Sequence, residues 1–275
     1  MAVFCILLAD ARSGTTLLGD AVSRSFRVVW PGEIFHDEFA NARLDFRSSE
    51  KISERFSFFN FRHEVFKTRP ELSMPSPANQ SLLLREYLEY LKSCEPAGRY
   101  LLDVKYASWH HLEPYWRTLQ SRPHLLKEAM RLHLPLVHLK RSNLFALYCS
   151  QQLATETGVW HVYQERPASD VRLTLDIPRC LRELDLIRSS QRMFDHWLAG
   201  YAHELEYETL ISADGFSTQV EQTFTQVYGI APAEPLSTVH WKVTPPLRHI
   251  VVNKDDVLSA LRGTDFQKMA EEVLS

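Results

Sequence analysis

Residues 3–16 read VFCILLADARSGTT, and the predicted architecture follows from this segment. Residues 3–8 are a continuous apolar run, which is typical of a central parallel strand that is covered on both faces. The polar residues 10–14 follow directly, and a helical pattern begins at Thr15. A buried strand that passes through a short loop into a helix predicts an open α/β sheet, and such sheets hold ligands at the carboxyl ends of their strands.

The same alternation of strands and helices continues along the chain. Further strands are predicted over residues 28–30, 100–106, 134–139 and 205–209, and an irregular aromatic stretch over residues 34–68. Helices are predicted over residues 15–25, 81–92, 124–132, 142–157 and 178–201, and two shorter ones end the chain. Ser142 is the predicted N-cap of its helix and Gly158 the left-handed stop, while Asn253 caps the last helix. We therefore predict one α/β domain over residues 1–275, with a central, mostly parallel sheet flanked by helices.

The composition limits the classes of function. The chain carries 31 basic and 34 acidic side chains, a formal net charge of −3, which excludes a polybasic coat and predicts no nucleic-acid partner. No stretch reaches the ~20 apolar residues of a membrane span, and the apolar start lacks the basic residues of a signal peptide. Four scattered cysteines without a CxxC pair predict buried thiols in a reducing cytoplasm and no metal knuckle (Cys5, Cys94, Cys149 and Cys180).

The loop after the first strand has the residues of a phosphate site: Arg12, Ser13, Gly14, Thr15 and Thr16. Gly14 lets the backbone approach a ligand closely, the helix start supplies unpaired N–H groups, and the two threonine hydroxyls add donors. Arg12 supplies a cation. The alternative is a plain polar turn in which Thr15 is the N-cap. The loop does not match GxxxxGK[ST], so the lysine and the Mg²⁺-binding hydroxyl of an ordinary ATPase are not in register.

A second group of polar residues follows the strand predicted over residues 134–139. Arg141 lies just after the carboxyl end of that strand, and Ser150 comes nine residues later on the next helix. Such a pair can bind a second phosphate through a cation and a hydroxyl. The alternative is a cation at a strand end and a helical serine that bonds its own backbone.

Together the two groups resemble the sulfotransferases that use 3′-phosphoadenosine-5′-phosphosulfate (PAPS), notably the bacterial carbohydrate-type branch that sulfates trehalose glycolipids and lipo-oligosaccharides. In that family an [RK]SGT[TS]-like loop holds the 5′-phosphosulfate, and a strand-end Arg with a Ser about nine residues later holds the 3′-phosphate. Residues 12–16, Arg141 and Ser150 match these motifs in order. Weaker likenesses lie at Pro31-Gly32-Glu33, Lys105, Val159-Trp160 and Tyr207-Glu208-Thr209-Leu210.

The resemblance implies a P-loop-like sulfotransferase fold and an enzyme that moves a sulfuryl group from PAPS to a carbohydrate hydroxyl, releasing 3′,5′-bisphosphoadenosine (PAP). The acceptor would be a capsular polysaccharide or a lipid-linked sugar, and no metal is expected. Arg12 would neutralise the leaving oxygen, and either Glu33 or His36 would be the general base. Lys105 would face the transferring group unless it is a solvated strand-end lysine, and Trp160 would stack on adenine unless it is a core residue.

Two departures and two alternatives accompany this interpretation. The loop cation is Arg12 rather than a lysine, which favours the carbohydrate branch. The basic, glycine-containing stretch that covers PAPS in cytosolic relatives has no clear counterpart, since Arg262-Gly263-Thr264 differs too much. The strand-loop-helix start would also suit a nucleotide kinase or P-loop NTPase, or a non-catalytic nucleotide-binding module. The phenylalanines between Phe56 and Phe66 line either an acceptor groove or, as we favour, a hydrophobic subdomain.

Overall fold

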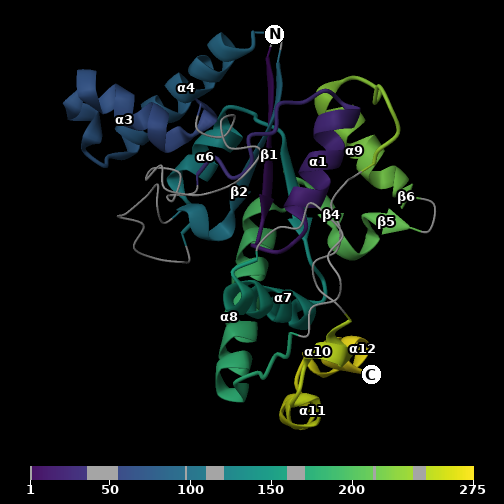
Figure 1. The fold of residues 1–275 in the computed structure, drawn as a ribbon. Coiled ribbons are helices and arrows are strands. Elements are labelled where there is room, and N and C mark those ends of the chain that lie inside the picture. Colours follow the sequence, from purple (N-terminus) through teal and green to yellow (C-terminus); the bar gives the residue numbers. More distant parts are fainter. Residues whose placement is uncertain are drawn as a thin grey trace.

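Four parallel strands form the central sheet of the computed structural model, in the order β2-β1-β3-β4. Their bounds are Val3–Ala9 for β1, Arg99–Lys105 for β2, Leu136–Lys140 for β3 and His203–Glu206 for β4. The structure describes residues 2–35, 55–96, 98–109, 121–159, 171–212, 215–237 and 246–275. Because each pair of neighbouring strands is parallel and helices flank the sheet, the predicted α/β class is confirmed (Figure 1).

Strand β1 is apolar along its whole length because it is covered on both faces and paired on both edges. Cys5, Leu7 and Ala9 face one helical layer, and the alternate residues Phe4, Ile6 and Leu8 face the other. The register pairs Ala9 with Lys105 of β2 and with Leu139 of β3. The carboxyl ends of the three strands therefore lie level, and the segments that follow them meet at one edge of the sheet.

Helices cover the two faces of the sheet (Figure 1). On one face lie α1 (Thr15–Ser25) and α9 (Thr218–Tyr228). On the other lie α3 (Phe58–Thr68), α4 (Pro77–Cys94), α6 (His124–Arg131) and the C-terminal part of α8 (Ile177–Leu198). A third apolar cluster joins α8 to α7 (Leu144–Thr157), α10 (Leu247–Ile250), α11 (Lys254–Leu261) and α12 (Gln267–Leu274).

Short elements complete the described chain. They are the 3-10 turns η2 (Pro70–Ser73), η3 (Tyr106–Ser108) and η4 (Tyr207–Thr209), and the two-stranded antiparallel pair of β5 (Ile211–Ser212) and β6 (Gly215–Phe216). All four cysteines are free, and all but Cys94 are buried. Among the described residues, no helix is both long and apolar enough to cross a membrane.

Several predicted elements differ from the structure at their ends. The aromatic stretch predicted to be irregular contains α3, which Ser57 caps by accepting a hydrogen bond from the Asn60 amide. Helix α4 begins at Pro77 rather than at residue 81, because Ser76 caps it and a proline suits the first helical position. Strand β4 ends before Tyr207, where the chain turns into η4.

Three predicted helix caps have different outcomes in the structure. The N-cap of α7 is Asn143, whose side-chain oxygen accepts from the Ala146 amide at 2.8 Å, so the prediction of Ser142 is wrong. Asn253 does precede α11, but its side chain bonds the backbone of Leu175 on both sides instead of the helix. Gly158 ends α7 in the left-handed conformation, as predicted.

The segment predicted as a second strand, residues 28–30, runs beside β2 at the edge of the sheet. Val29 makes a parallel bridge with Tyr100, and Glu33 makes one with Asp103. Trp30 of this segment packs on α1 where the helix has Gly19. A Cβ atom on Gly19 would lie 2.6 Å from the Trp30 Nε1 atom, so this helical glycine is needed for contact rather than for backbone freedom.

Gly19→Ala is expected to destabilise the protein, against the usual sign for glycine in a helix. Alanine ordinarily adds up to ~1 kcal/mol of helix stability, but overpacking against Trp30 costs about 1–3 kcal/mol. We expect the free energy of unfolding to fall in urea denaturation. In a Trp30→Ala background the same substitution should be neutral or stabilising. A stabilising effect with Trp30 in place would show that the ring does not pack there.

Candidate functional site

The loop between β1 and α1 has a backbone that favours anion binding. Arg12 has φ +67° and Gly14 has φ +90°, so both are in the left-handed region, where a residue other than glycine is strained. Gly14 is the N-cap of α1 and Thr15 is its first helical residue, so the alternative with Thr15 as the N-cap is wrong. Because the N-cap residue has no side chain, it leaves the amides of the first turn uncapped, and such amides suit an anion.

Gly14 is required at this position for a second reason, the ring of Tyr207. A Cβ on Gly14 would lie 2.7 Å from the Tyr207 Cε2 atom. The same ring carries the guanidinium of Arg141, whose Cζ atom is 4.7 Å from the ring centroid. One aromatic side chain thus contacts both the loop after β1 and the turn after β3.

The structure brings the two predicted phosphate-binding segments together. Arg12 donates through Nε to the Ser150 Oγ atom at 3.2 Å, and Arg141 donates through Nη1 to the Arg12 carbonyl at 3.2 Å. Gln151, next to Ser150 on α7, donates to the Ala11 carbonyl at 3.2 Å. Segments about 130 residues apart in sequence therefore form one hydrogen-bonded unit.

This unit concentrates positive charge and unpaired donors. Burial lowers the pKa of Arg12, with a further contribution from the charge of Arg141, and burial also lowers the pKa of Arg141. Within the described part of the chain, the buried Ser13 Oγ and Arg141 Nε atoms have no hydrogen-bond partner. A buried donor without a partner costs about 1–3 kcal/mol, so a bound anion that accepts from these groups would stabilise the site.

Lys105 lies beneath the loop in a buried network. Its ammonium donates to both carboxylate oxygens of Asp103, at 2.7 and 2.8 Å, and to the Thr15 hydroxyl. It also lies 3.4 Å from a carboxylate oxygen of Glu33. Burial alone would lower the pKa of Lys105, but the carboxylates of Asp103 and Glu33 raise it, so the lysine is charged. The alternative of a solvated strand-end lysine is wrong, since Lys105 is 6% exposed.

This network changes what two predicted residues offer to a ligand. The hydroxyl of Thr15 is engaged by Lys105, so its backbone amide is the group that remains for an anion. Glu33 is held at the edge of the sheet by Lys105 and by its bridge to Asp103. Asp103 was not among the predicted site residues. It lies two residues before Lys105, and residues two apart on a strand share a face, so this spacing could have revealed it.

The structure describes only one of the three remaining predicted site residues, Thr16. Thr16 is half-buried in the first turn of α1, next to the loop. His36, the other candidate base, and Trp160, the candidate adenine contact, lie outside the described residues.

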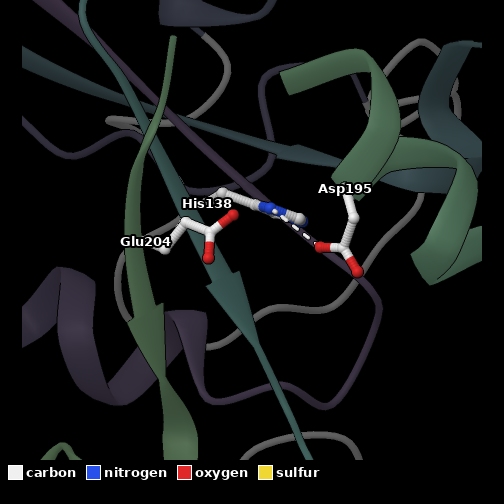
Figure 2. A group of neighbouring side chains, drawn as sticks. All are labelled: His138, Asp195 and Glu204. Atoms are coloured by element: carbon white, nitrogen blue, oxygen red, sulfur yellow. Dashed lines mark ion pairs between the residues drawn. The ribbon is translucent and has the colours of Figure 1, made fainter. Parts of the chain in front are cut away.

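A second polar cluster, which the sequence analysis missed, lies on the α8 face of the sheet: His138, Asp195 and Glu204 (Figure 2). His138 on β3 has no exposed surface, and its Nδ1 atom points to the Asp195 carboxylate on α8 at 3.8 Å. Its Nε2 atom is bonded to the Tyr106 hydroxyl. The alternation of His138 and Lys140 on one apolar strand was the signal that could have revealed it.

The cluster has ligand atoms suited to a metal ion, but the chain supplies its own cation. One ligand atom from each of His138, Asp195 and Glu204 lies within 4.8 Å of the others. The Lys140 ammonium lies 3.2 Å from Asp195 and 2.9 Å from Glu204. Because Lys140 already pairs with both carboxylates, we interpret the cluster as a partly exposed ion-pair network beside a buried histidine.

His138 is expected to make stability depend on pH. Burial lowers its pKa to about 4, and the charge of Lys140 acts in the same direction against the carboxylate of Asp195. The folded state therefore resists protonation, and its stability falls as the pH drops below the ordinary histidine value near 6.5. At pH 5 this histidine lowers the free energy of unfolding by about 2 kcal/mol.

The measurement compares unfolding of the wild type and of His138→Gln between pH 7 and pH 5. The wild type should lose about 2 kcal/mol more than the variant over this range. Burial also raises the pKa of Asp10 to about 6, with the opposite effect on stability, but Asp10 is present in both proteins and cancels in the comparison. Parallel pH profiles would mean that His138 is not kept neutral by the fold.

No protein-family model matches this sequence, and no curated protein matches it.

Proposed function

We propose that the protein is a PAPS-dependent sulfotransferase that sulfates a hydroxyl of a carbohydrate acceptor, a polysaccharide or a glycolipid, and releases PAP. One observation carries this proposal: Arg12 and Arg141 with Ser150 form one hydrogen-bonded unit at the edge where the parallel strands end. A ligand with two phosphate groups suits a unit that holds two guanidinium groups. The resemblance of these segments to the sulfotransferase motifs supplies the reaction.

The loop after β1 and the pair Arg141 and Ser150 offer different groups to a phosphate. The left-handed Gly14 and the uncapped start of α1 suit the 5′-phosphosulfate, because backbone amides and the helix dipole favour an anion there. Arg141 and Ser150 suit the 3′-phosphate, since a guanidinium forms strong charge-assisted hydrogen bonds with phosphate oxygens. We therefore propose a P-loop-like sulfotransferase arrangement for this parallel sheet.

In the proposed reaction the bond from sulfur to the PAPS phosphate oxygen breaks while a bond to the acceptor oxygen forms. Arg12 stabilises the charge that develops on the leaving oxygen, and the base takes the acceptor proton. Glu33 stands on the segment beside β2, within ion-pair distance of Lys105. It is the candidate base whose position the structure describes, and His36 remains the other candidate. Most of the rate acceleration would come from positioning and charge stabilisation.

The Lys105 network favours this proposal over a nucleotide kinase. In P-loop enzymes a loop hydroxyl and a strand carboxylate hold the Mg²⁺ ion that neutralises the phosphates. Here the ammonium of Lys105 bonds both the Thr15 hydroxyl and the Asp103 carboxylate. Lys105 therefore occupies a hydroxyl and a carboxylate of the kind that would bind Mg²⁺.

PAP is expected to bind and to stabilise the protein without added Mg²⁺. At 100 times its dissociation constant it should add about 2.7 kcal/mol, which a thermal shift detects readily. Arg141→Ala should remove roughly 2–3 kcal/mol of PAP binding and leave adenosine-5′-phosphate (AMP) nearly unaffected. A shift with ATP and Mg²⁺ but none with PAP would contradict the proposal and favour a kinase.

Replacing the base should abolish turnover without loss of PAP binding. Glu33→Gln should lower turnover by roughly 10²–10⁴-fold if Glu33 is the base, and His36→Ala should do so if His36 is. Sulfated product would be followed by mass spectrometry with PAPS and a panel of sugars. Because Glu33 also contacts Lys105, PAP affinity is measured for each variant. Near-normal turnover in both variants would place the base elsewhere.

A further inference from the structure

Glu208, in the turn η4 after β4, binds the start of helix α7. Its carboxylate accepts from the Ser142 amide at 2.9 Å and from the Asn143 amide at 3.0 Å. Asn143 is the N-cap of α7, so both amides lie at the positive end of the helix dipole. A carboxylate that lies 66 residues away in sequence therefore fills the position at which a helix start ordinarily attracts an anion.

This contact fixes the turn that carries Arg141. Arg141 directly precedes the two bonded amides, and its Nε atom lies 4.0 Å from the Glu208 carboxylate. The neighbouring Tyr207 ring supports the guanidinium from another side, and Nη1 donates to the Arg12 carbonyl. Helix α7 then carries Ser150 to the Arg12 side chain. The place of both Arg141 and Ser150 thus depends on how α7 starts.

The charge of Glu208 also limits where an anion can bind. With both amides occupied and a negative charge beside them, a phosphate is excluded from the α7 terminus. The groups left for it are the side chains of Arg141 and Ser150, on the side of the loop after β1. Arg141 Nε has no hydrogen-bond partner in the described ranges and lies 4.0 Å from the Glu208 carboxylate, so Glu208 orients the guanidinium through an ion pair.

We propose that Glu208 is a positioning residue for the second phosphate of the nucleotide. It occupies the two amides at the start of α7 and holds Arg141 and Ser150 toward the phosphate loop, so that the 3′-phosphate is bound by these two side chains. This inference rests on the proposed function, because it concerns the second phosphate of the same nucleotide.

The test measures affinities for two probes, PAP and AMP, by titration calorimetry. The variants are Glu208→Ala and the isosteric Glu208→Gln, with Glu206→Gln as a control of equal charge change on an exposed side chain of β4. Glu208→Ala should weaken PAP binding at least about tenfold while AMP changes little, since the lost contacts orient only the 3′-phosphate groups. Glu208→Gln should recover part of the PAP affinity, because an amide oxygen still accepts from one backbone N–H.

Selectivity gives a readout that a general loss of structure would not produce. The preference for PAP over AMP should fall at least about tenfold in Glu208→Ala and by less in Glu208→Gln, because the amide still holds one backbone N–H. AMP binding reports whether each variant is folded.

Three results would overturn the inference while the proposed function stands. They are an unchanged ratio of PAP to AMP affinity in both Glu208 variants, an equal loss of both ligands, and the same effect in Glu206→Gln. Failure of the wild type to bind PAP would instead overturn the proposed function, and the inference with it.

Discussion

Strand β1 is paired on both edges, and this pairing sets where the polar segments of the candidate site lie. Strand β1 is parallel to β2 and β3, and the register places Ala9 beside both Lys105 and Leu139. The three segments that follow these strands therefore meet at one edge of the sheet. The strand must then be apolar on both faces, which explains its unbroken hydrophobic run. Polar groups gather where the strands end, and there the chain carries its buried cations.

Each of these cations is held by other groups of the chain. Lys105 is bonded to Asp103 and Thr15, and Arg141 is bonded to a loop carbonyl and rests on an aromatic ring. A buried charge is tolerated only when it is paired and hydrogen-bonded, so these contacts are a condition of folding. They also fix the positions of the cations, and under the proposed function such fixed charges would stabilise the developing charge.

The segment after β4 joins the two halves of the candidate site. Tyr207 contacts Gly14 and Arg141, while Glu208 binds the start of α7. Two adjacent residues thus set the relation between the loop after β1 and the turn after β3. The His138 network lies on the opposite face of the same strand from Val137 and Leu139, and there Lys140 pairs with Asp195 and Glu204. The charged groups therefore extend beyond the candidate site along the α8 face.

Local sequence pattern predicted the α/β class and most of the helices and strands, although it missed α3. The apolar run of β1, the glycine that follows it and the spacing of leucines on the helices depend on neighbours within a few residues, so local pattern predicts them. It also singled out Arg12 and Arg141, which follow strands, and Ser150 on the helix after Arg141. It failed at element ends, as with Asn143 in place of Ser142, because either side chain can cap a helix and only the backbone geometry selects one.

Which polar side chains bond one another follows from the tertiary structure alone. The bonds from Arg12 to Ser150, from Glu208 to the α7 amides and from Lys105 to Thr15 join residues 138, 66 and 90 positions apart. Such contacts follow from strand order and register, which no local pattern contains. Burial also sets the charge of two of these residues. Lys105 is a charged lysine because carboxylates lie beside it, whereas His138 is neutral because burial lowers its pKa.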